Sequence, residues 1–288
     1  MSTEQLTTRP HSSALRVSNP PALTRLVNLF ASDHAALMPY FPLGFPDAAT
    51  SLDVITAMSQ AGADAFEIGL SFSDPLADGP VIQHATQVAL EKGITVKQSL
   101  EMIAQLRSRG VIQPFLVMGY YNPIFAYGLT RFVTEAAAAG ADGFIVPDLP
   151  PEEADDLDRL CREQELGLVY FLAPTSTEDR VKLVAEKAQG FIYLVSIAGV
   201  TGARSQVAEG LSDFVGRIRR TTLQLRAGQA PTPIAIGFGV STPQQAGEVS
   251  HLADGVIVGS ALVHLVDRAQ DKPQAAAQFI CELKARMR

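Results

Sequence analysis

The chain has 288 residues, of which 47% are apolar, and a formal net charge of -7 at neutral pH. This composition excludes a wholly disordered chain, and the acidic balance without a basic stripe argues against nucleic acids and anionic membranes as partners. The length is compatible with two average domains, but also with one α/β barrel.

Residues 1–20 contain no apolar core, so they predict a flexible tail and not a signal peptide. No apolar run approaches the roughly 18 residues that a membrane-spanning helix needs. Cys161 and Cys281 lie in helical stretches and match neither a disulfide framework nor a metal-binding motif. Buried thiols in a reducing cytoplasm are therefore expected.

An amphipathic helix is predicted before the first strand, because Leu23, Leu26, Val27 and Phe30 follow an i, i+3, i+4, i+7 pattern. Short apolar runs, each a predicted strand, then alternate with helical segments such as those within 51–60 and 181–188. The runs span residues 37–42, 65–70, 114–118, 143–146, 168–172, 191–196, 233–237 and 255–259.

A signature recurs before three of these runs, as Ala-Gly-Ala-Asp at 61–64 and 139–142 and as Leu-Ala-Asp-Gly at 252–255. Each copy indicates a helix end followed by a short buried strand. Near-continuous apolar strands between helices are typical of a parallel sheet, and eight such units predict one (β/α)8 TIM barrel over residues 21–288, with an extra N-terminal helix. A doubly wound open sheet is the alternative, weakened because no G-x-G-x-x-G motif follows the first strand.

The second predicted strand carries a glutamate in its interior. Alternation places Glu67 on the sparse face with Ala65 and Gly69, toward the barrel interior, where desolvation raises the pKa of a carboxyl group. Asp78 lies in the following loop and is expected to stay ionised. Two carboxyl groups in different environments can hold different catalytic roles. The alternative is a glutamate satisfied by backbone amides, with the loop aspartates capping the next helix.

Glycine-containing loops follow the sixth, seventh and eighth predicted strands, at residues 199–203, 237–241 and 259–260. Glycine lets backbone N–H groups approach an anion, and the loops after strands seven and eight form the common phosphate site of this fold. A phosphate site is therefore predicted there, and ordinary turns are the alternative.

The sequence lacks the residues that two kinds of aldolase need, a lysine at a strand end and a cluster of histidines. The six lysines all lie in helical or surface stretches, so no Schiff-base lysine is expected at a strand end. The five histidines are scattered, which argues against a zinc site, and no metal is expected. Carbon–carbon cleavage would then need acid–base catalysis and a substrate that accepts the electrons itself.

Five motifs closely resemble the tryptophan synthase alpha subunit family, over a match from about Leu37 to the C-terminus. The most specific is S-D-P-L-A-D-G-P at residues 73–80; the others are M-G-Y-Y-N-P at 118–123, V-P-D-L-P at 146–150, G-V-T-G at 199–202 and G-F-G at 237–239. The resemblance implies retro-aldol cleavage of indole-3-glycerol phosphate to indole and glyceraldehyde 3-phosphate, without a cofactor in this chain.

By the same resemblance, Glu67 moves protons at indole C3 and at the glycerol hydroxyl, and Asp78 accepts a hydrogen bond from the indole N–H. Plain core packing is the alternative for the aromatic side chains in the site. Ser71 in place of a proline, and Ile197 in place of an arginine, depart from the family pattern. The implied substrate contacts are Tyr40, Tyr120, Tyr193, Thr201, Gly202, Phe238, Gly239, Gly259 and Ser260.

The resemblance also implies a partner, a beta subunit that holds pyridoxal phosphate in an α2β2 tetramer, with Asp74 and Pro75 at the interface. Three other interpretations stay open: a free-standing lyase that releases indole, a barrel kept as a binding or regulatory subunit, and another phosphosugar enzyme of the same barrel type.

Overall fold

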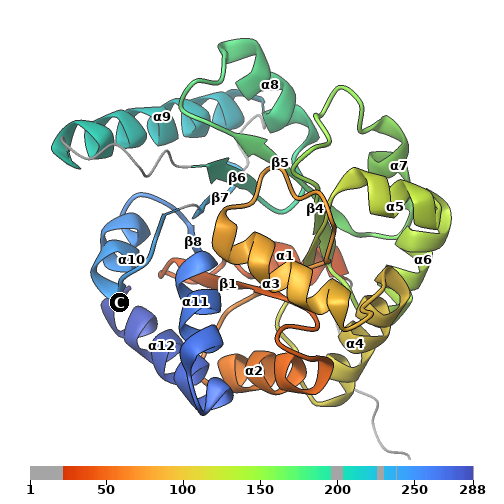
Figure 1. Ribbon diagram of the computed structural model, residues 1–288. Helices are drawn as coiled ribbons and strands as arrows, with labels where there is room; N and C mark the ends of the chain where they lie inside the picture. Colours follow the sequence, from red (N-terminus) through yellow and green to blue (C-terminus); the bar gives the residue numbers. More distant parts are fainter. Residues whose placement is uncertain (1–21, 196–203, 226–229, 238, 288) are drawn as a thin grey trace, which may run out of the picture.

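The computed structural model describes residues 22–195, 204–225, 230–237 and 239–287. Its strands form a closed parallel barrel in chain order, in which β8 pairs with β1 (Figure 1). The predicted barrel is therefore confirmed, and the open-sheet alternative is wrong. The strands are β1 (Ala36–Pro42), β2 (Phe66–Gly69), β3 (Phe115–Met118), β4 (Gly143–Ile145), β5 (Gly167–Leu172), β6 (Ile192–Val195), β7 (Ile234–Gly237) and β8 (Gly255–Val258).

Helices surround the barrel, because the apolar face of each can bury itself only against the sheet and its neighbouring helices (Figure 1). No helix in the described part of the chain is long and apolar enough to cross a membrane. The helices are α1 (Ala22–Asn28), α2 (Ala48–Gln60), α3 (Pro80–Glu91), α4 (Val96–Ser108), α5 (Tyr121–Tyr127), α6 (Leu129–Ala139), α7 (Asp155–Glu163), α8 (Glu178–Lys187), α9 (Arg204–Leu225), α10 (Pro243–Ser250), α11 (Ser260–Arg268) and α12 (Lys272–Arg286).

The predicted N-terminal helix is present as α1, and it packs at the start of β5. Leu26 is fully buried there, so close to Gly190 that a Cβ on that residue would lie 2.5 Å from the leucine Cδ2. Val27 was expected on the same apolar face but is 55% exposed. The cysteine prediction was half wrong: Cys161 is buried, whereas Cys281 lies exposed on α12.

The two faces of β2 separate the core from the barrel interior. The Phe66 ring packs against Phe115 at 5.8 Å, and the Arg107 guanidinium of α4 lies 3.9 Å from the Phe115 ring centre, so this face lies under the helices. Glu67 therefore points the other way, into the barrel, as the alternation predicted.

The aspartates of the recurring signature connect neighbouring strands, a role that the sequence alone did not predict. Each of the three aspartates donates its backbone N–H to a carbonyl on the preceding strand and accepts that same residue's N–H with its side chain. This two-bond ring, here called an aspartate clamp, joins the amino-terminal ends of neighbouring strands. The side-chain bonds pair Asp64 with Leu37 at 2.7 Å, Asp142 with Phe115 at 2.7 Å and Asp254 with Ile234 at 2.8 Å.

Each clamp is also closed by a cation from a surrounding helix. Asp142 is the most buried: its side chain has no exposure and binds both Arg25 and Arg107, at 2.7 and 2.6 Å. Lys284 binds Asp64 at 2.6 Å, and Arg219 binds Asp254 at 3.1 Å. The clamps therefore fix strands and helices together at the end of the barrel opposite the carboxyl ends of the strands.

Candidate active site

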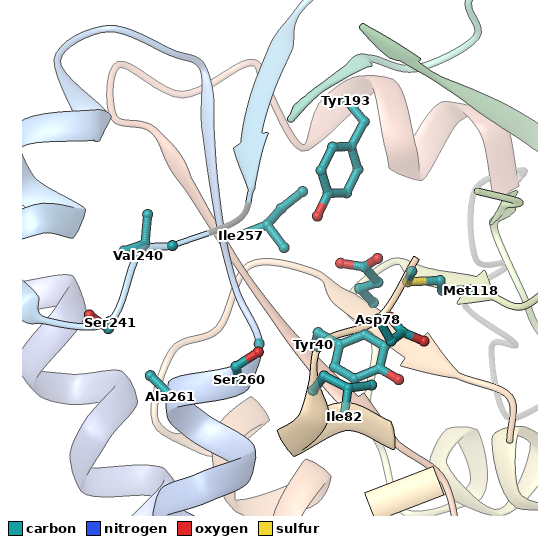
Figure 2. A pocket seen from close by; sticks show the side chains of 14 residues that line it. Tyr40, Asp78, Ile82, Met118, Tyr193, Val240, Ser241, Ile257, Ser260 and Ala261 are labelled. Carbon is teal, nitrogen blue, oxygen red and sulfur yellow. The ribbon is translucent and has the colours of Figure 1, made fainter. Parts of the chain in front are cut away.

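A cavity of about 230 Å³ opens at the carboxyl-terminal ends of the strands, where this fold places its active sites. Residues from β1, β2, β3, β6 and β8 line it, together with the loops that follow β2, β7 and β8. Figure 2 shows Tyr193 on one side of this space, and Tyr40 with Asp78 on another. The sequence predicted all three in the site, together with Glu67, and the structure brings them together.

Glu67 is the most unusual group in the cavity. It is 2% exposed, and its Oε1 atom has no hydrogen-bond partner in the described part of the chain. Burial, helped by the nearby Asp78 charge, raises its pKa to about 8. Glu67 therefore holds a proton at neutral pH, and the alternative of a glutamate satisfied by backbone amides does not account for Oε1.

Asp78 has a more polar environment than Glu67. Its Oδ2 accepts a hydrogen bond of 3.1 Å from the Tyr120 hydroxyl, and that hydroxyl in turn accepts the Ala77 N–H at 2.9 Å. Burial raises the pKa of Asp78 while the Tyr120 hydrogen bond lowers it, so this carboxyl is not the ordinary solvated one that its loop position suggested. The N-cap of α3 is Gly79, with no side-chain cap, so Asp78 does not cap the helix.

The far end of the cavity is built from backbone. Gly239 after β7 has φ +94°, a conformation that favours glycine, and Gly259 is the N-cap of α11 without a side-chain hydrogen bond. The first N–H groups of α11 are therefore left for a ligand, and its dipole favours an anion. Ser260 begins this helix and also lines the cavity, as do Gly239 and Gly259.

An apolar surface between these two ends is the part that sequence reasoning missed. Ile82 from α3, Met118 from β3 and Ile257 from β8 line the cavity, and Val240 and Ala261 add to it (Figure 2). Met118 and Ile257 occur within strand runs, where alternation could have selected them as inward-facing.

The remaining predicted residues have different outcomes. Tyr120 is connected to the site by the hydrogen bond from its hydroxyl to Asp78, whereas Asp74 and Pro75 lie in the loop after β2. No lysine is among the described residues that line the cavity, and the described residues contain no cluster suited to a metal ion. Three predicted contacts, Thr201, Gly202 and Phe238, lie outside the described residues, as do Ile197 and the tail of residues 1–20.

Known proteins resemble this chain along most of its length. A family model described as tryptophan synthase alpha chain matches residues 26–288. The tryptophan synthase alpha chain of Chloroflexus aurantiacus is 47% identical over 257 residues, which cover 88% of this chain and 94% of that one. The alpha chain of Dehalococcoides mccartyi is 46% identical over 249 residues, which cover 86% of this chain and 94% of that one.

Solved structures agree with this assignment. A chain from Aquifex aeolicus VF5 superposes with a TM-score of 0.81 at 40% identity and covers 92% of this chain and 99% of its own. A chain of Mycobacterium tuberculosis tryptophan synthase superposes with a TM-score of 0.81 at 37% identity and covers 92% and 98%. With the barrel, the paired carboxyl groups and the backbone-lined end of the cavity, these matches show that the chain belongs to the tryptophan synthase alpha chain family, a family of lyases.

Proposed function

We propose that this chain cleaves indole-3-glycerol phosphate to indole and glyceraldehyde 3-phosphate, with Glu67 moving the protons and Asp78 stabilising the charged intermediate. One observation carries the proposal: a buried glutamate, whose pKa burial raises, shares a cavity with a second carboxyl group and with an uncapped helix N-terminus. A proton donor, a charge stabiliser and an anion site are the three parts that this reaction needs.

The reaction begins with proton transfer from Glu67 to indole C3. The indole nitrogen then carries positive charge, and the Asp78 carboxylate accepts its N–H and stabilises that charge. The Glu67 carboxylate next takes the proton of the glycerol hydroxyl, whose carbon becomes the aldehyde. The bond from C3 to that carbon breaks, and the two electrons of this bond return to the indole ring. Glu67 gives one proton and recovers one, so it ends the cycle as it began.

The protonated indole ring replaces the electron sink that a Schiff-base lysine would provide. This agrees with the absence of lysine from the described lining of the cavity. The phosphate of the substrate would lie against Gly239, Gly259 and Ser260, at the start of α11. Holding that end fixed places the reacting carbon beside Glu67.

Indole release from indole-3-glycerol phosphate by the purified chain tests the proposal. Glu67→Gln should lower kcat by about 10³-fold, because an amide cannot exchange the proton, and Asp78→Asn should lower it by at least ~10²-fold. Glu282→Gln, on the exposed face of α12, is the matched control and should keep the wild-type rate. Substantial turnover by Glu67→Gln would reject the role of Glu67.

The family pairs with a beta subunit, and we infer that the loop after β2 takes part in that contact within an α2β2 tetramer. Leu76 follows Asp74 and Pro75 and is 93% exposed, and Phe125 on α5 is 61% exposed. Apolar side chains exposed to this degree are suited to a protein partner. Pyridoxal phosphate would belong to that partner, while this chain performs its own step without a cofactor.

Mixing the chain with a beta subunit separates this proposal from a free-standing lyase. Binding should raise the rate of indole formation, and Leu76→Asp should weaken the activation while the rate of the chain alone is unchanged. A rate that no concentration of beta subunit alters would favour the free-standing enzyme.

A further inference from the structure

The hydroxyl of Tyr40 occupies a space that only glycine leaves open. A Cβ on Gly69, in β2, would lie 2.3 Å from the Tyr40 hydroxyl oxygen and 2.7 Å from its Cζ atom. No ordinary side chain could approach so closely, so Gly69 is required for the hydroxyl to be where it is. Gly69 is the last residue of β2, and the same Cβ would lie 2.9 Å from the Tyr40 Cε2 atom, so the glycine makes room for the hydroxyl and for the adjoining edge of the ring.

Tyr40 lies beside both carboxyl groups of the site. Its Cα pairs with that of Glu67 in the ladder between β1 and β2, and the two residues line the same cavity as Asp78. Figure 2 shows Tyr40 next to Asp78. The tyrosine is 6% exposed and lines the cavity. Its phenol pKa is raised well above its ordinary value, by burial and then by the Asp78 and Glu67 charges, so it stays a hydrogen-bond donor.

Glu67 needs such a donor at one stage of the reaction. Its Oε1 has no partner among the described residues, which is tolerable while the group is protonated but costly once it is a buried carboxylate. The titratable groups that face it are Tyr40 from β1, Asp78 from the loop after β2 and Tyr193 from β6. Asp78 is an acceptor when ionised, and Tyr120, beyond it, already donates to Asp78. Of the two tyrosines that face Glu67, Tyr40 comes from the strand that pairs with β2, opposite Glu67 itself, whereas Tyr193 comes from β6, which does not pair with β2.

Building on the proposed function, we propose that Tyr40 is a positioning residue whose hydroxyl donates a hydrogen bond to the Glu67 carboxylate that forms after C3 is protonated. The bond stabilises that carboxylate and aims it at the glycerol hydroxyl for the second proton transfer. The phenol keeps its own proton throughout, so the proton balance of the reaction is unchanged. A contact with the indole ring of the substrate would need only the tyrosine ring and not its hydroxyl.

Tyr40→Phe deletes the hydroxyl and keeps the ring. The variant should lower kcat about 10- to 30-fold with KM within about twofold, because the lost bond is made only after substrate is bound. Loss of a donor to the charged form raises the pKa of Glu67, so the decline of kcat at high pH should move about one unit higher. A role in packing alone would change KM or thermal stability and leave the pH profile in place.

Tyr170→Phe is the matched control, because the Tyr170 hydroxyl is also buried but has no partner among the described residues and does not line the cavity. It should leave kcat and the pH profile unchanged. A wild-type chain that releases no indole would overturn the proposed function itself. Cleavage by the wild type with an equal kcat and pH profile for Tyr40→Phe would overturn only the assignment of Tyr40.

Discussion

The Tyr120 hydroxyl donates to Asp78 Oδ2 at 3.1 Å while it accepts the N–H of Ala77 at 2.9 Å. One side chain at the end of β3 thus holds both the carboxyl group and the backbone of the loop that carries it. The Phe72 ring packs against Tyr120 at 5.5 Å and fixes that tyrosine in turn. Asp78 is therefore oriented before substrate arrives, although it lies in a loop.

Tyr120→Phe should lower kcat about tenfold, because Asp78 loses the bond that orients it and the Ala77 N–H loses its acceptor. The Tyr120 bond lowers the pKa of Asp78, so its removal raises that pKa, and activity at acid pH should decline at a higher pH than in the wild type. The measurement is kcat against pH. Tyr127→Phe, on the neighbouring α5, makes the same chemical change outside the cavity and should have no effect; equal effects of the two variants would contradict the orienting role.

Glu67 should make the chain less stable as pH rises. Its pKa is about 8 in the folded chain against 4.5 for an unburied glutamate, so between these values the unfolded chain has lost the proton that the folded chain keeps. The free energy of unfolding therefore falls through this window and is level above it. Glu67→Gln lacks this titration. At 1.36 kcal/mol per pH unit, its unfolding free energy should therefore rise by about 4 kcal/mol relative to that of the wild type between about pH 5 and pH 8. Urea unfolding at both pH values measures it, and parallel pH dependences of variant and wild type would disprove the buried acid.

Ser260→Asp should separate phosphate binding from folding. An aspartate in the first turn of α11 suits the helix dipole, so the thermal midpoint should be kept or raised. The same carboxylate would stand where the substrate phosphate is proposed, and KM should rise at least ~10²-fold by charge repulsion and lost backbone contacts. Ser260→Ala is the control and should change KM only slightly. An unchanged KM for the aspartate variant would place the phosphate elsewhere.

The aspartate clamps should contribute to stability and not to catalysis. Asp142→Asn removes the buried charge that binds two arginines, each 18% exposed, and should cost about 3 kcal/mol of unfolding free energy. Asp254→Asn should cost about 1 kcal/mol or less, because that pair is about 40% exposed and screened by solvent. Urea midpoints rank the two variants, and kcat of both should be unchanged at temperatures where they are folded. Equal losses would show that burial does not set the cost.

The barrel and the placement of Glu67 and Asp78 in its cavity could be predicted because local patterns determine them. The alternation in β2 placed Glu67 inside, and the glycines after β7 and β8 indicated the backbone-lined end of the cavity. Long-range partners could not be predicted, since nothing near Asp78 in the sequence shows that Tyr120 binds it from another loop. The upward pKa shift of Asp78 follows from that tertiary burial and was missed for the same reason.

The aspartate signature shows the same limit. Its recurrence was visible, and its position before a strand was interpreted correctly. However, the side-chain bond from Asp64 to the N–H of Leu37 depends on strand register, which a single strand's sequence does not specify. The cations that close the clamps come from α1, α4, α9 and α12, and no local pattern links those helices to the aspartates.

Four strand pairs begin with an odd-numbered strand: β1–β2, β3–β4, β5–β6 and β7–β8. An aspartate clamp joins three of them, and the pair of β5 and β6 has none. Counting back three residues from the Tyr170–Ile192 pair, the position that matches Asp142 is Gln189, whose side-chain amide donates to Asp158 Oδ1 at 2.9 Å and does not close a ring with β5. Among these four pairs, three are thus held by a clamp, and the pair of β5 and β6, beneath Tyr193, is not. We expect amide hydrogen exchange to be faster at this pair than at the three clamped pairs, so that the barrel opens between β5 and β6 before it opens at the joint of β1 with β2, which carries Glu67.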